Sequence, residues 1–102
     1  MSATNYIPAF PVPHPGEILK DEILPAAELR PAEAARRIGV SPQSLHAILH
    51  GKAGISADMA LRLAALFGNS PMHWLNMQAL YDLQRSSQRL QADIDHIEPV
   101  AA

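Results

Sequence analysis

Two histidines, His46 and His50, are four residues apart, a spacing found in metal-binding and catalytic helices. On a helix, side chains four apart share one face, so this pair could ligate a transition metal. A catalytic zinc helix of the H-E-x-x-H type also needs a glutamate after the first histidine, and here that position is Ala47. We therefore predict no metal, no cofactor and no catalytic residue, and we interpret the two histidines as part of a binding surface.

The elements that must position this surface belong to one small domain. The chain has 102 residues, of which 48% are hydrophobic and 18% charged, so it can bury a core. It contains no cysteine, which excludes a disulfide scaffold and a thiolate zinc site. We see no secretory signal and no apolar run of the roughly 20 residues that a membrane span needs. These features predict a cytoplasmic protein.

The charge is distributed unevenly along the chain. The formal net charge is -2, yet the segment 30–62 carries five basic residues against two acidic ones. The segments on both sides are acidic in balance. A basic middle of this kind suits the footprint of a polyanion, although scattered solvated charge is the simpler alternative.

Capping residues and hydrophobic spacing predict an all-α protein of five helices. Ser41, Ser56 and Ser70 are natural N-caps, Gly39 and Gly68 suit the left-handed closing position, and Pro25 should stop the first helix. The predicted helices span 15–24, 31–38, 41–50, 56–68 and 70 to about 88. We divide the chain into an extended Pro-rich arm (1–14), a helical domain (15–88) and a short tail (89–102).

The second and third predicted helices have the pattern of a helix-turn-helix. Only Gly39, Val40 and Ser41 separate them, a length that sets two helices at a steep crossing angle. Ala34 and Ala35 are small enough for the close approach that such a crossing needs. Apolar contacts for the inner face come from Ile38, Val40, Leu45 and Ile48.

The outward face of the third predicted helix is suited to reading DNA. At 100° per residue, Leu45, Ile48 and Leu49 share the inner face, and polar residues share the opposite one. A glutamine can pair with adenine through two hydrogen bonds, and an alanine can contact a thymine methyl. The candidates for base contact are Gln43, His46 and Ala47. The candidates for phosphate contact are Arg36, Arg37, Ser41, Ser44, His50 and Lys52, with capping by Ser41 and a solvated arginine stripe as alternatives.

The fifth predicted helix is apolar almost all the way round. A surface helix should show one apolar stripe, so the remaining apolar residues need a second partner. A symmetric dimer is the economical solution, and it would place two recognition helices about one DNA turn, roughly 34 Å, apart. The interface candidates are Trp74, Met77, Leu80 and Tyr81.

Three segments resemble the Cro/phage-repressor (XRE) type of helix-turn-helix and, more narrowly, the HigA antitoxins. They read HPGEIL, GVSPQSLHAILHGKAGIS and ADMALRLAALFGNSPMHWLNMQALYDL, and the resemblance covers residues 14–83. It implies a five-helix lambda-repressor-like DNA-binding domain with a central helix-turn-helix. It also implies a homodimer that binds operator DNA, represses its own operon and neutralises a HigB-like, mRNA-cleaving toxin.

Two positions depart from the pattern of these repressors. Pro42 stands where a polar base-reading side chain is common, and Arg30 stands where a capping serine or threonine is usual. Both put the DNA sequence preference in doubt and leave the fold intact. Two alternative functions stay open: a stand-alone or phage-type regulator without a toxin, and a protein-interaction adaptor that has lost DNA binding.

Overall fold

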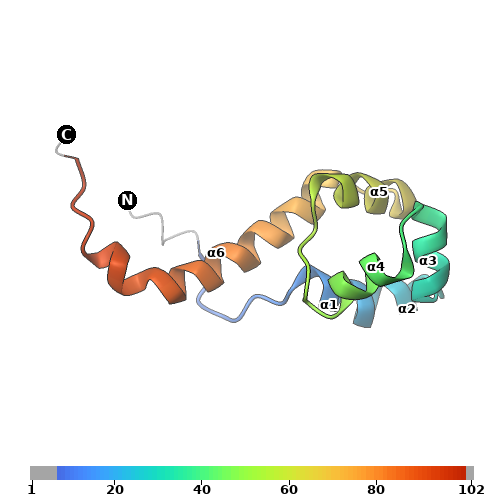
Figure 1. The fold of residues 1–102 in the computed structure, drawn as a ribbon, viewed down its shortest axis with the longest axis horizontal. Coiled ribbons are helices and arrows are strands. Elements are labelled where there is room, and N and C mark those ends of the chain that lie inside the picture. The colour runs from blue at the N-terminus through green and yellow to red at the C-terminus, as the bar shows by residue number, and fades with distance from the viewer. Residues whose placement is uncertain (1–6, 101–102) are drawn as a thin grey trace.

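The computed structural model describes residues 7–100, and all regular elements among them are helices (Figure 1). The elements in chain order are α1 (Pro15–Ile18), η2 (Leu19–Ile23), α2 (Leu24–Ala26), α3 (Pro31–Ile38), α4 (Pro42–Leu49), α5 (Ala57–Phe67) and α6 (Pro71–Asp95). The first three run without interruption, so the described part of the chain has five helical units. The predicted all-α class and the order of the five helices are confirmed.

The first helical unit passes through Pro25, so the prediction that this proline ends it is wrong. Proline lacks an N–H, and its ring crowds the carbonyl four residues earlier in a regular α-helix. Here the preceding turn, η2, is a wider π-helical turn, in which the Leu24 N–H bonds to the Leu19 carbonyl. This widening precedes the proline, and the helix continues to Ala26.

The start of the first unit is fixed against the back of α4. The Nδ1 atom of His14 accepts a hydrogen bond from the Gly16 N–H at 2.9 Å and so caps α1. A Cβ atom built on Gly16 would lie only 1.8 Å from the carbonyl oxygen of Ile48. Glycine is therefore required where α1 crosses α4.

The boundaries of α3, α4 and α5 match the sequence prediction. Ser41 and Ser56 accept hydrogen bonds from the N–H groups of Ser44 and Met59, at 3.1 and 3.2 Å. Gly39 closes α3 in the left-handed conformation, with φ of 75°. Arg30 precedes α3 without a side-chain cap.

The core lies between the first helical unit, α3, α4, α5 and the first turns of α6. Its largest fully buried side chain is Trp74, whose indole N–H donates to Oδ1 of Asn69 at 2.9 Å. Trp74 is 0% exposed, so a partner subunit could not contact its side chain. The prediction of Trp74 as a dimer-interface residue is therefore corrected: this side chain packs the core of its own subunit.

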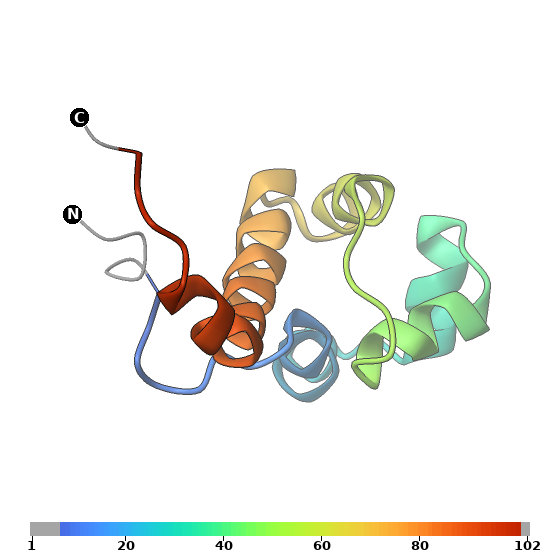
Figure 2. The same ribbon diagram turned by 60° about the vertical axis from the view of Figure 1, so that its left-hand side comes forward.

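Helix α6 is longer than predicted and reaches beyond the rest of the fold (Figures 1 and 2). It continues to Asp95 instead of ending near Gln88, so residues 89–95 are helical and not part of a tail. The apolar stripe weakens after Leu83, yet the residues that follow are good helix formers with no glycine or proline. Gln91 also donates to Asp95, four residues on, at 2.8 Å.

The described part of the Pro-rich arm, residues 7–14, is hydrogen-bonded to α6 through the buried side chain of Gln84. Gln84 accepts from the Val12 N–H at 2.7 Å and donates to the carbonyls of Pro8 and Phe10 at 2.9 and 2.6 Å. Residues 1–6 and 101–102 of the predicted arm and tail lie outside the described residues. Within residues 7–100, no helix has both the length and the hydropathy for crossing a membrane.

Candidate nucleic-acid interface

Helix α4 has the two faces that its sequence predicts. Leu45, Ile48 and Leu49 are buried, and the polar residues of the opposite face are exposed. Gln43 and His46 line a shallow, open depression of about 280 Å³ together with Pro42. Pro42 thus shapes the edge of this face without offering a hydrogen-bond donor.

The two histidines of α4 lie against each other. Their ring centroids are 4.0 Å apart, with 39° between the ring planes. No group of three or more potential metal ligands forms among the described residues. Loss of hydration lowers the pKa of His50, and the positive charges of His46, Lys20 and Lys52 lower it further. This clustering of cationic groups can attract an anion.

Lys20 is a member of this face that the sequence analysis missed. It lies in η2, on the first helical unit, yet its charge acts on His50 near the end of α4. Only the crossing of α1 and α4 at Gly16 brings them together. No spacing in the sequence could have signalled this electrostatic interaction.

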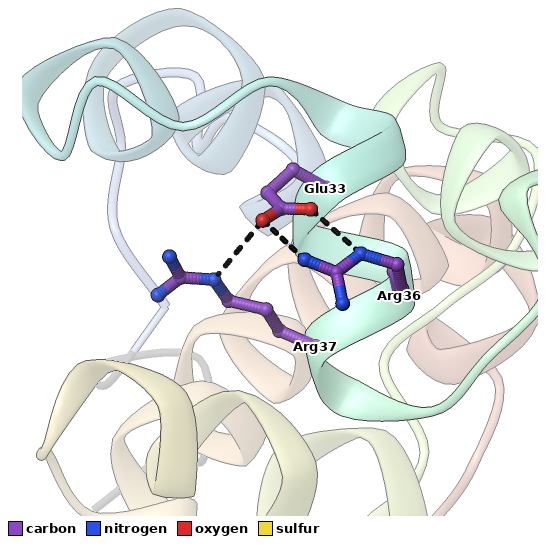
Figure 3. Close-up of polar contacts among 3 residues, drawn as sticks. All are labelled: Glu33, Arg36 and Arg37. Atoms are coloured by element: carbon purple, nitrogen blue, oxygen red, sulfur yellow. Dashed lines mark hydrogen bonds and ion pairs between the residues drawn. The ribbon is translucent and has the colours of Figure 1, made fainter.

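Arg36 and Arg37 are held by a residue that the sequence analysis also missed, Glu33 (Figure 3). Nε of Arg36 donates to Oε2 of Glu33 at 2.8 Å, and its Nη2 bonds to Oε1. Nε of Arg37 lies 3.5 Å from the same Oε1 atom. The bonds from Arg36 lower the pKa of Glu33 and raise that of Arg36.

All three side chains are on the surface, so a phosphate could replace the carboxylate as a partner. The spacing of three and four residues along α3 is the signal that could have revealed this cluster.

The remaining phosphate-contact candidates lie at the two ends of α4. Ser41 Oγ accepts a hydrogen bond from the Ser44 N–H, so Ser41 caps α4 as predicted. The same Oγ donates to the Ser44 hydroxyl at 2.8 Å. Ser44 stays exposed at the helix N-terminus, where the helix dipole favours an anion. Lys52 is exposed in the loop that follows α4.

A buried glutamine of α6 fixes that loop. Gln78 accepts from the Ile55 N–H at 2.8 Å and donates to Asp82 at 3.0 Å. Gly54 passes so close to it that an added Cβ would meet the Gln78 amide at 3.2 Å. The role of Gln78 was not predicted, because a single glutamine in a helix is usually exposed to solvent.

The comparison with known proteins agrees with this geometry. The helix-turn-helix family profile matches residues 19–75. Virulence-associated protein I of Dichelobacter nodosus is 43% identical over 88 residues, which cover 86% of this chain and 79% of that protein. Antitoxin HigA-1 of Vibrio cholerae is 32% identical over 85 residues, or 83% of this chain and 80% of that one.

A solved structure of the Pseudomonas aeruginosa antitoxin HigA with the higBA promoter has a TM-score of 0.83 and 40% identity to this chain. The match covers 88% of this chain and 99% of that one. The chain therefore belongs to the Cro/phage-repressor type of the helix-turn-helix family, as one of its HigA-like antitoxins.

Proposed function

We propose that this protein is a dimeric, operator-binding repressor that serves as the antitoxin of a HigB–HigA type module. In this role it represses the operon that encodes it and neutralises a HigB-like, mRNA-cleaving toxin. The observation that carries the proposal is the exposed polar face of α4, where the charges of Lys20 and Lys52 act on His50. Support comes from the 40% identical HigA, whose structure was solved with promoter DNA.

In the proposed complex, α4 lies in the major groove and its exposed face meets the base edges. Gln43 pairs with an adenine, and His46 and Ala47 contact the neighbouring bases. Phosphates are held by Arg36, Arg37, Ser41, Ser44, His50 and Lys52, and we add Lys20 to this set. Such phosphate contacts fix the position of the protein on the duplex, whereas the base contacts select its sequence.

Replacing Gln43 tests the base-reading role. We expect Gln43→Ala to weaken binding to duplex from the gene's own promoter about tenfold or more, the usual effect of losing one bidentate base contact. Binding to random duplex should change little. Fluorescence anisotropy at two salt concentrations measures both. Gln88→Ala, at another exposed glutamine far along α6, is the matched control. Equal losses on promoter and random DNA would contradict base reading.

The antitoxin role is tested separately from DNA binding. We expect the protein to form a stable complex with the HigB-like protein encoded next to it and to restore growth of cells that express this toxin. Gln43→Ala should retain both properties. If the neighbouring genes encode no such protein, or if the two do not associate, the chain is a stand-alone regulator.

A further inference from the structure

An open groove of about 480 Å³ lies between α3 and α5, apart from the exposed face of α4. Its lining residues are Arg37, Ile38, Arg62, Ala65 and Leu66. None of the residues that we propose to read bases lines it. Arg37 is therefore the one phosphate-contact candidate that also faces a second surface.

The groove combines two guanidinium groups with an apolar lining. Arg62 is anchored by a bond from its Nη1 to the Ile38 carbonyl at 2.6 Å, and its other N–H groups have no hydrogen-bond partner among residues 7–100. The Arg37 side chain is 54% exposed and reaches Glu33 only at 3.5 Å. Guanidinium groups bind carboxylates, often through two parallel bonds. The apolar residues between them suit an aliphatic side chain, so the groove fits a segment that carries both.

The last residues of α6 and those that follow them have that chemistry. Residues 93–100 read DIDHIEPV, in which three carboxylates alternate with aliphatic residues. Ile97 is 68% exposed and Val100 is 96% exposed, so neither is covered by its own subunit. Figure 1 shows this segment at the end of the molecule opposite α3 and α5, the two helices that line the groove, and the molecule measures 53 Å along its longest axis. The segment cannot fold back into the groove of its own chain.

We propose that the groove between α3 and α5 binds the acidic, aliphatic segment 93–100 of a second copy of this protein. One or two carboxylates of Asp93, Asp95 and Glu98 meet Arg37 and Arg62, and an isoleucine or valine contacts Ile38 and Leu66. The two surfaces differ, so the contact is head-to-tail and can link more than two copies. It is distinct from a symmetric dimer through α6, and it would join dimers bound at neighbouring DNA sites.

A labelled peptide with the sequence of residues 91–102 tests the contact directly. We expect saturable binding to the full-length protein by fluorescence anisotropy, weaker at high salt because the paired charges are exposed. Arg37→Gln should weaken this binding about tenfold, a typical effect of losing a charged hydrogen bond. Arg89→Gln removes the same charge from an exposed site on α6 and should leave peptide binding unchanged. Arg37→Gln leaves the Arg62 bond to Ile38 intact, so a folding defect is not expected.

A second peptide, with Asp93→Asn, Asp95→Asn and Glu98→Gln, separates charge from apolar contact. We expect it to bind at least tenfold more weakly than the natural sequence. No binding of the natural peptide overturns the proposal, as does equal binding to Arg37→Gln and the unchanged protein. Arg37→Gln should also weaken duplex binding, because Arg37 is a proposed phosphate contact; if it weakens duplex binding and leaves peptide binding unchanged, the groove proposal fails. Because the peptide assay contains no DNA, its result is independent of the proposed repressor function.

Discussion

His14 is a buried residue that stabilises the fold only in its neutral form. It is 8% exposed, its ring lies edge-on to Tyr81 at 4.9 Å, and its Nδ1 must accept the Gly16 N–H. Burial lowers the pKa of His14; the charges of Asp82 and Glu17 and the Ala53 backbone oppose that effect. A protonated Nδ1 could not accept the bond, so protonation removes the cap of the first helix.

The stability of the protein should therefore fall in mild acid. The folded pKa of His14 lies below the unfolded value of about 6.5, so its contribution is complete above that pH and is lost as the pH falls through the folded value. We expect His14→Asn, which keeps a capping side chain but has no titratable group there, to lose less stability between pH 7.5 and 5.5 than the unchanged protein. Urea unfolding at the two pH values measures this. Parallel losses in both proteins would contradict the assignment.

The neighbouring histidines of α4 predict a second pH effect, on DNA binding. In the free protein, dehydration and the neighbouring cations lower the pKa of His50, whereas a nearby phosphate would favour its charged form. Promoter affinity should therefore rise between pH 7.5 and 6, by at most about tenfold per pH unit for each proton taken up. The double variant His46→Gln, His50→Gln should flatten this dependence in anisotropy titrations. His96→Gln, at an exposed histidine beyond α6, should keep it.

At the scale of elements, the crossing of α1 and α4 depends on the absence of a side chain. The Gly16 backbone packs directly on the Ile48 carbonyl, near the end of the recognition helix. This contact sets where Lys20 lies relative to His50. The orientation of the proposed DNA-binding face thus depends on the helix that carries Lys20.

Gly16→Ala should destabilise the protein by about 3 kcal/mol or more, because the new methyl group cannot fit without moving one of the two helices. Gly51→Ala is the control: nothing lies within 4 Å of its added Cβ, and only the positive φ of 70° opposes alanine. We expect a loss of about 1–2 kcal/mol there. Chemical denaturation followed by circular dichroism compares them. Similar losses at both positions would show that the α1–α4 contact can relax.

The boundaries of α3, α4 and α5 could be predicted because their signals are local. A serine cap and a closing glycine act within one helical turn, so they can be recognised in the sequence. The continuation through Pro25, the burial of Trp74 and the position of Lys20 could not be predicted in the same way. Each depends on what another element places beside it, and a single sequence does not contain that information.

At the scale of the whole molecule, α6 projects an apolar face away from the domain. Leu80 and Leu83 are 39% and 53% exposed, and Met77 and Tyr81 are half-buried beside them. With Trp74 assigned to the core, these four residues are the surface that we propose for the symmetric dimer. A dimer formed through this surface would hold its two copies of α4 at a fixed distance and orientation.

Leu80→Arg should therefore convert the dimer to a monomer in sedimentation velocity at micromolar concentration. Promoter affinity should fall by tenfold or more, since each half-site would then be bound separately. Leu61→Arg introduces the same charge at a 60% exposed leucine of α5 and should leave the dimer intact. Dissociation by Leu61→Arg, and not by Leu80→Arg, would place the interface on α5.

The bonds between the arm and Gln84 have a consequence for how the protein is made. Val12 and its partner Gln84 are 72 residues apart in the sequence. During synthesis the arm is translated before its binding site on α6. Until then the arm's backbone is available to peptidases and chaperones. Each new molecule thus passes through a period in which the arm lacks its partner, and this period ends only after Gln84 has been translated.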